Sequence, residues 1–265
     1  MRVKTLLLTA VLALSLTACA PAETEPTPSP TPVPTETAPS AETAAPVWSD
    51  QLFTKEFTAD DGTVVMSVDY RFPDIENAAE SSAWQKIRDY YAAEGMAYLS
   101  DAAELSGYAA GDYEVAQAMG EEFLPYGESM SYRLTLQTEG LVSVARSYYA
   151  NSVTGAAHPA NFQFSETFDL ATGEKLALWD CFTDPDAART RVLDLLAQKG
   201  ADAGYAQESL EAELNEDYFY LNDEGLVIYY QPDTLAPYAA GLLEFTLPYA
   251  DLQDLLAISP VPSET

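Results

Sequence analysis

The chain has one histidine, and it lies in a loop. His158 follows Gly155-Ala156-Ala157 and precedes Pro159. Loops carry a large share of binding and catalytic residues, so the ring is a candidate functional group. The interpretation we favour is a histidine that caps backbone carbonyl groups and holds the loop in place. A single histidine excludes a His-x-x-x-His or His-Glu-x-x-His centre, and we predict neither a metal site nor a cofactor.

The residues do not form a recognisable catalytic motif. The sequence has no Gly-x-Ser-x-Gly elbow and no phosphate-binding glycine loop. Its 42 Asp and Glu residues make some close carboxylate pairs inevitable, and nothing singles out two of them for glycoside cleavage. Cys181 lies between Trp179 and Phe182, which predicts a buried small apolar side chain. We therefore predict that the protein is not an enzyme and has no catalytic residues.

Aromatic residues are the stronger candidates for recognition. The chain has 17 tyrosines, and tyrosine is favoured at interface hot spots. Tyr148 and Tyr149 end a predicted strand just before the histidine loop, and Pro232 and Tyr238 bracket a second loop. We take His158, Tyr148, Tyr149, Pro232 and Tyr238 as candidate binding residues. Packing in a sheet is the alternative role for many of the tyrosines.

Alternating apolar and polar residues predict the strands that must position these groups. Turn residues separate three pairs of strands, which predicts three hairpins, at residues 52–57 with 64–72, 132–137 with 141–149, and 218–221 with 226–230. Phe162, Phe164, Glu166 and Phe168 share one face of a further strand. Pro73 is expected to end the second strand, and a last strand is expected at residues 243–247.

Helical spacing predicts four helices between and after the strands. The first has its N-cap at Asn77 and runs to Leu105, followed by an ambiguous glycine-containing region at residues 107–128. Asp184-Pro185 starts a second helix that Gly200 stops. A short third helix covers residues 207–214, and residues 252–256 close the chain. The predicted fold is α+β, with a mainly antiparallel sheet built from hairpins, packed helices and two sub-lobes.

The N-terminal residues predict a location outside the cytoplasm. Arg2 and Lys4 precede an apolar run at residues 6–16 that is too short for a convincing membrane span. Leu16-Thr17-Ala18-Cys19 resembles a lipobox, which implies diacylglycerol on Cys19, cleavage before it, and acylation with a fatty acid such as palmitate. We expect a lipoprotein anchored on the extracytoplasmic face of the cell membrane. A Pro-, Thr- and Glu-rich linker follows up to residue 46.

The formal net charge of −30 limits the partners. Such a surface repels nucleic acid and anionic lipid headgroups, so we predict no nucleic-acid ligand and contact with the membrane only through the lipid anchor. It attracts cationic proteins and speeds their association. Solubility alone is the other explanation of the charge.

Three stretches together carry a resemblance to a known family. They are TGAAHP, FDLATGEKLALWDCF, and the C-terminal YFYLNDEGLVIYYQPDTLAPYAAGLLEFTLPYADLQDLL. They resemble the extracellular domain of the RsiV-type anti-sigma factor, which also occurs in PdaC-type peptidoglycan deacetylases. The resemblance covers most of residues 50–257. It implies an α+β fold of two sub-lobes and, from the anti-sigma factor, the binding of lysozyme.

The sequence shows neither the signalling half of the anti-sigma factor nor a deacetylase module, so only the extracellular domain is expected. We predict a signal peptide at 1–18, the lipidated cysteine and linker at 19–46, sub-lobes at 47–172 and 173–258, and a tail at 259–265. The predicted function is a cell-surface binding module that captures or senses a cationic wall-active protein such as lysozyme. The alternatives are a module that binds peptidoglycan or muropeptides, and a structural accessory domain of the envelope.

Overall fold

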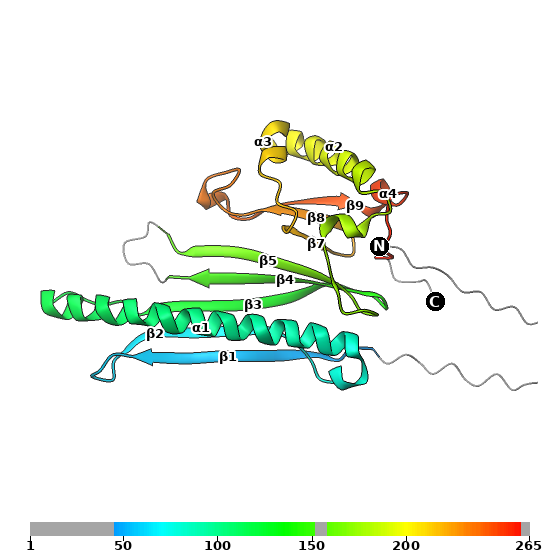
Figure 1. Ribbon diagram of the computed structural model, residues 1–265. Coiled ribbons are helices and arrows are strands. Elements are labelled where there is room, and N and C mark those ends of the chain that lie inside the picture. The colour runs from blue at the N-terminus through cyan, green and yellow to red at the C-terminus, as the bar shows by residue number, and fades with distance from the viewer. Residues whose placement is uncertain (1–44, 152–157, 261–265) are drawn as a thin grey trace, which may run out of the picture. The chain divides into compact units, whose positions relative to one another are not determined.

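The computed structural model describes residues 45–151 and 158–260, which belong to one compact unit (Figure 1). Over these residues the fold is α+β, with a six-stranded sheet, a three-stranded antiparallel sheet and four α-helices. This confirms the predicted fold class. The predicted signal peptide, Cys19 and nearly all of the linker lie outside the described residues.

The six strands of the first sheet lie side by side in chain order. They are β1 (Trp48–Thr58), β2 (Val64–Ile75), β3 (Tyr126–Gln137), β4 (Leu141–Ala150), β5 (Ala160–Asp169) and β6 (Lys175–Leu176). Neighbours are antiparallel except β2 and β3, which run parallel. A parallel pair needs a long crossover connection, and the helix between these two strands supplies it. The two hairpins predicted in this part of the chain are confirmed as β1–β2 and β3–β4.

The prediction that Pro73 ends its strand is wrong. Strand β2 continues to Ile75, and Pro73 pairs with Asp50 of β1. On its other side, β2 pairs with β3 only from Met66 to Tyr70. Beyond Tyr70 no strand of the described residues pairs with the second edge of β2, so a residue without an N–H group is tolerated there.

The first helix, α1 (Ser82–Met119), differs from its prediction at both ends. Ser81 is its N-cap, with Oγ accepting from the N–H of Ala83 at 3.2 Å. Asn77 precedes a short 3-10 turn and accepts instead from the N–H of Val47 at 2.8 Å. The helix also continues beyond Leu105 until Gly120, whose φ of 71° is the left-handed conformation that glycine adopts readily.

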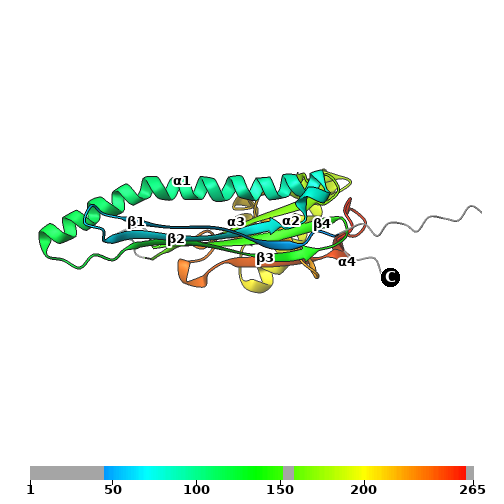
Figure 2. The ribbon, with the colours of Figure 1, turned by 90° about the horizontal axis from the view of Figure 1, so that it is seen from below.

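Helix α1 covers one face of the first sheet, as the two ribbon views show (Figures 1 and 2). It packs chiefly on β1 and β2, and the core between them is rich in aromatic side chains. Tyr98 lies 5.7 Å from Tyr70 and 5.8 Å from Tyr148, measured between ring centroids. The predicted face of Phe164, Glu166 and Phe168 points into this core, where Phe168 contacts Tyr90 and Tyr91 of α1.

The second sheet is formed by the C-terminal part of the chain together with three short or medium helices. Its elements are α2 (Pro185–Ala203), α3 (Gln207–Ala212), β7 (Phe219–Leu221), β8 (Gly225–Tyr230), β9 (Leu243–Pro248) and α4 (Tyr249–Leu252). The third predicted hairpin is confirmed as β7–β8. Asp184 is the N-cap of α2, as predicted, and its side chain accepts from the N–H of Ala187.

Two predicted helix boundaries in this part are wrong. Helix α2 passes Gly200 and ends at Ala203, with Gly204 as its C-cap. Gly200 is needed for packing and not as a helix stop, because it is buried and a Cβ atom there would clash with the side chain of Leu210. The last helix, α4, lies earlier than residues 252–256 and follows β9 directly. Tyr249 and Leu252 are its buried residues, so packing against the second core sets its position.

Hydrogen bonds join the second sheet to the first. The polar face of β4 and β5 supplies them: Ser143 Oγ accepts from the N–H of Leu221 at 3.0 Å, and Ser165 Oγ donates to the carbonyl oxygen of Phe219. Leu136 and Leu141 from the first sheet also belong to the core around the second sheet. The change from one sheet to the other falls after β6, and the sub-lobe boundary at residue 173 stays a prediction.

Candidate binding site

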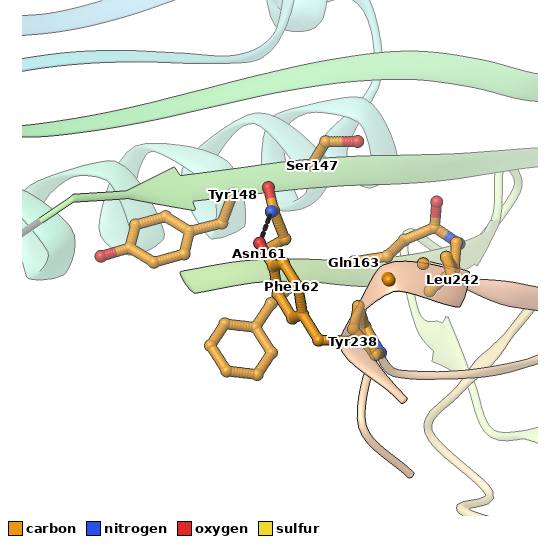
Figure 3. A pocket seen from close by; sticks show the side chains of 10 residues that line it. Ser147, Tyr148, Asn161, Phe162, Gln163, Tyr238 and Leu242 are labelled. Carbon is orange, nitrogen blue, oxygen red and sulfur yellow. Dashed lines mark hydrogen bonds between the residues drawn. The ribbon is translucent and has the colours of Figure 1, made fainter. Parts of the chain in front are cut away.

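A pocket of about 410 Å³ lies where β4 and β5 meet the loop between β8 and β9 (Figure 3). We call it the end pocket. Its lining comes from β4 and β5 of the first sheet and from the loop between β8 and β9. Among the described residues it consists of aromatic, amide, hydroxyl and small side chains, with no carboxylate and no basic group. The lining residues are Ser147, Tyr148, Asn161, Phe162, Gln163, Pro232, Tyr238, Ala239, Gly241 and Leu242.

Two neighbouring strands position an aromatic pair on one side of the pocket. Tyr148 of β4 and Phe162 of β5 are directly opposite each other in the strand register. Phe162 is 45% exposed, which is unusual for phenylalanine in a sheet. Burial, and next the charge of Glu128 with its hydrogen bond, raise the pKa of Tyr148 above its ordinary value. Tyr148 is therefore a neutral hydroxyl under physiological conditions.

The loop wall of the pocket is held by Tyr238. Its hydroxyl oxygen accepts a hydrogen bond from Asn161 Nδ2 (Figure 3). On the ring, His158 stacks with centroids 3.7 Å apart and an angle of 13° between the planes. His158 Nε2 also lies 3.3 Å from Asp233 Oδ2, and both of these side chains are largely exposed, so this contact adds little stability.

Gln231 fastens the loop to the edge of β5. Its side-chain Oε1 accepts from the N–H of Gln163 at 3.0 Å, and its Nε2 donates to the carbonyl oxygen of Gln163 at 2.6 Å. Both residues are buried. The amide thus pairs with β5 as a neighbouring strand would, and it satisfies backbone groups that burial would otherwise leave costly.

The Gln163 side chain extends this junction. Its Nε2 donates to Glu244 Oε1 at 3.2 Å, and its Oε1 accepts from Arg133 Nη1 at 3.3 Å. Tyr220 donates its hydroxyl to the same Glu244 oxygen at 3.0 Å. Strands β3, β5, β7 and β9 therefore meet in one polar network beside the pocket, which holds its two walls together.

The end pocket lies at the end of the unit opposite to the first described residues. Strand β1 starts at Trp48 on the right of Figure 1 and runs left, whereas β4 ends and β5 begins at the left. The loop between β8 and β9 is at the left as well. The chain therefore enters the unit at one end and presents the pocket at the other.

The structure brings most of the predicted binding residues together. Tyr148, Pro232 and Tyr238 line the pocket, and His158 contacts it through Tyr238. Tyr149 is directly opposite Asn161 in the strand register but is not part of the lining. We expected His158 to cap backbone carbonyl groups of its loop. One such contact is present, since its Nδ1 lies 3.2 Å from the carbonyl oxygen of Pro159. The loop residues just before His158 are outside the described part of the chain.

The sequence reasoning missed the amides. Asn161 and Gln163 follow the polar parity of β5, and this alternation was the only signal that they share a face. Nothing in the sequence indicated that the opposite wall would be Leu242 and the residues around it. That contact depends on how the second sheet docks.

The arrangement suits recognition of a ligand through ring stacking and neutral hydrogen bonds. Within residues 45–151 and 158–260, no group of three or more His, Cys, Asp or Glu residues is placed to hold a metal ion.

Cys181 is buried, as its apolar neighbours predicted. Burial, with a smaller effect of Asp180, raises the pKa of its thiol to about 12, so the thiolate is scarce at neutral pH.

No helix among the described residues is long and apolar enough to span a membrane.

Residues 180–250 match a protein family described as "Protein of unknown function (DUF3298)". No curated protein matches the chain.

Two solved structures share the fold. One is a DUF3298 family member from Bacteroides fragilis NCTC 9343, with a TM-score of 0.57 and 19% identity over 82% of this chain and 95% of that chain. The other is a DUF3298 family protein from Pseudomonas aeruginosa PAO1, with a TM-score of 0.55 and 14% identity over 83% of this chain and 99% of that chain.

Proposed function

We propose that this protein is a binding module that captures a cationic wall-active protein at the cell surface. Lysozyme is the partner that the resemblance to the RsiV-type domain suggests. The lipid on Cys19 would hold the module on the extracytoplasmic face of the membrane, and the linker would carry it outward. The observation that supports this most is the end pocket, whose exposed aromatic lining lies at the far end from residue 45.

The aromatic residues of the pocket have the chemistry of an interface anchor. Phe162 presents an exposed ring beside Tyr148, and the ring of Tyr238 is held in place by Asn161 and His158. Rings that are fixed before binding lose little conformational freedom when a partner covers them. Such residues typically carry most of the free energy of association.

The charge of the protein supports a cationic partner. Many of its basic side chains are engaged in ion pairs with acids, among them Arg71 with Asp50, Arg88 with Asp74 and Arg133 with Glu244. The excess of acids therefore dominates the surface. A basic partner would be steered to it, and added salt would slow that encounter.

Titration calorimetry of the protein with lysozyme, at low and at moderate salt, tests this proposal. We expect binding at low salt that weakens as salt increases. Phe162→Ala and Tyr238→Ala should each lower the affinity about tenfold or more. Tyr149→Ala is the matched control, because Tyr149 is 42% exposed but outside the lining. No binding at either salt concentration would remove lysozyme as the partner.

A neutral glycan is a second candidate ligand for the same pocket. The observation that favours it is the lining itself, which combines aromatic rings with the amides of Asn161 and Gln163 and has no charged side chain. Muropeptides that quench the intrinsic fluorescence to the same extent at low and high salt would favour this ligand. The Phe162→Ala protein should then lose the quenching, and lysozyme binding should be absent.

A further inference from the structure

The C-terminal half of α1 carries a second exposed surface, whose residues are not part of the lining of the end pocket. Six residues spaced three or four apart form one stripe on the helix: Asp101, Glu104, Tyr108, Asp112, Val115 and Met119. Tyr108 is 72% exposed, Val115 52% and Met119 68%. Acidic and apolar side chains thus share a helix face that the sheet does not cover. We call these six residues the α1 stripe.

The segment after α1 extends the stripe into a pocket of about 380 Å³. Val115, Phe123 and Leu124 supply apolar surface to it, and Glu121 and Glu122 supply carboxylates. Leu124 is 75% exposed. Tyr126 donates its hydroxyl to Asp112 Oδ2 at 2.7 Å, which fixes the start of β3 against the helix. The apolar surface is therefore held on a rigid element.

The sequence around this surface is entirely free of basic residues. From Asp89 to Tyr132 the chain has nine Asp and Glu residues and no Lys or Arg. An apolar stripe flanked only by acids is complementary to an apolar stripe flanked by bases. A helix offers such a stripe with the same spacing of three and four residues, and it can lie alongside α1.

We propose that the α1 stripe and the adjoining pocket dock a cationic amphipathic helix of a partner. A second copy of this chain fits poorly, since it would bring the same acids face to face. A bilayer with anionic headgroups is repelled by the same carboxylates. The inference goes beyond the proposed function, because it concerns another surface and a helical peptide rather than the ligand of the end pocket.

A synthetic amphipathic helix of Leu and Lys, of about 18 residues, is a suitable probe. Its fluorescently labelled form is titrated with the purified protein, and anisotropy reports binding. We expect saturable binding that weakens with salt. A scrambled peptide of the same composition, with no apolar face, should bind at least tenfold more weakly. Equal affinity for the two peptides would overturn the proposal, because only bulk charge would then matter.

Substitutions locate the site. Tyr108→Ala and Met119→Ala should each weaken peptide binding about tenfold, and Met119→Lys should weaken it further by adding a like charge. Met96→Ala is the matched control, because Met96 is 58% exposed on the same helix but off the stripe, and it should change the affinity less than twofold. An equal loss with Met96→Ala, or no loss with the stripe variants, would overturn the proposal.

The charged positions give an independent comparison. Asp101→Asn removes a carboxylate from the stripe, and Glu114→Gln removes one from another face of α1. The first should weaken binding about threefold and the second should not. Circular dichroism establishes that each variant keeps its helix. A dimer that Met119→Ala dissociates, or binding to neutral vesicles that it abolishes, would assign the surface to those occupants and overturn the proposal.

Discussion

Arg146 and Glu166 form an ion pair in the core between α1 and the first sheet. Both side chains are 3% exposed, and Arg146 Nε donates to Glu166 Oε2 at 3.1 Å. The guanidinium group also lies 5.2 Å from the ring centroid of Phe72 and 5.5 Å from that of Phe164. Burial by itself would lower the pKa of Arg146, but the charge of Glu166 and its hydrogen bond raise it above the ordinary value.

Glu166→Ala should destabilise the protein strongly, because it removes the buried carboxylate that pairs with Arg146 and leaves only the more exposed Glu94, 3.3 Å from Arg146 Nη2. We expect a loss of about 3–5 kcal/mol in the free energy of unfolding. Urea denaturation followed by tryptophan fluorescence measures it. The control is Lys86→Ala, which breaks an ion pair with Glu174 that is more than half exposed and should cost less than about 1 kcal/mol. Similar losses in the two variants would contradict a structural role of the buried pair.

Stability should fall at alkaline pH. Burial raises the pKa of Tyr230 to about 12, and burial followed by the charge of Glu166 raises that of Tyr91 well above its ordinary value of about 10. A group whose folded-state pKa is raised contributes stability that is complete below the unfolded pKa. That contribution is lost as pH rises above about 10 toward the folded-state value.

Urea denaturation between neutral pH and about pH 11 measures this loss. Phenolate absorbance should appear together with unfolding, since the buried tyrosines ionise only when exposed. Tyr91→Phe should reduce the slope of stability against pH above pH 10. A slope that is unchanged in that variant would mean that Tyr91 does not contribute.

Gly241→Ala should disturb the loop wall of the end pocket. Gly241 has φ 73° and ψ −157°, a backbone conformation essentially restricted to glycine, and it follows the turn that carries Tyr238. We expect a cost of about 1–3 kcal/mol and weaker binding of any ligand of the pocket. Gly107→Ala, at an unobstructed position inside α1, is the control and should stabilise the protein slightly. Unchanged stability of Gly241→Ala would show that the turn relaxes freely.

Gln231→Leu should loosen the junction between the two sheets. It leaves the N–H and carbonyl groups of Gln163 without the partners that the Gln231 amide supplies. Unpaired buried polar groups of this kind cost about 1–3 kcal/mol. Thermal unfolding compared with Gln207→Leu, whose exposed amide donates to Glu211 of the same helix, isolates this effect. A smaller loss for Gln231→Leu than for Gln207→Leu would contradict the assigned role.

The thiol of Cys181 should be inert in the folded protein. It is buried, and its pKa is raised to about 12 by burial and by Asp180. Reaction with a disulfide reagent at neutral pH should therefore require unfolding, and its rate should rise with urea as the protein opens. Fast labelling in the absence of denaturant would indicate an accessible thiolate.

The local rules of turns and caps account for what could be predicted of the fold. Asp60-Asp61-Gly62 and Glu139-Gly140 contain residues that favour tight turns, and the hairpins formed there. Asp184-Pro185 combines a capping carboxylate with a proline at the first helical position. These signals are contained in a few consecutive residues, so no knowledge of the rest of the chain was needed.

The wrong predictions share a different cause. Asn77 and Gly200 have the residue types of a helix cap and a helix stop, but Asn77 bonds to Val47 and Gly200 makes room for Leu210. Pro73 was tolerated because a neighbouring strand is missing beside it. In each case the packing of the folded chain, which a local pattern does not show, decided which of two local roles the residue takes.

The sequence by itself determined the class of the fold, the acidic character and the aromatic residues available for recognition. Only the tertiary structure decided that Tyr148 is part of the lining of the end pocket, whereas Tyr149 is not, and that Asn161 reaches the hydroxyl of Tyr238. The physical reason is that strand alternation assigns residues to faces but does not say what covers each face. Docking of the second sheet on β5, through Gln231 and Gln163, supplies that information and creates the pocket.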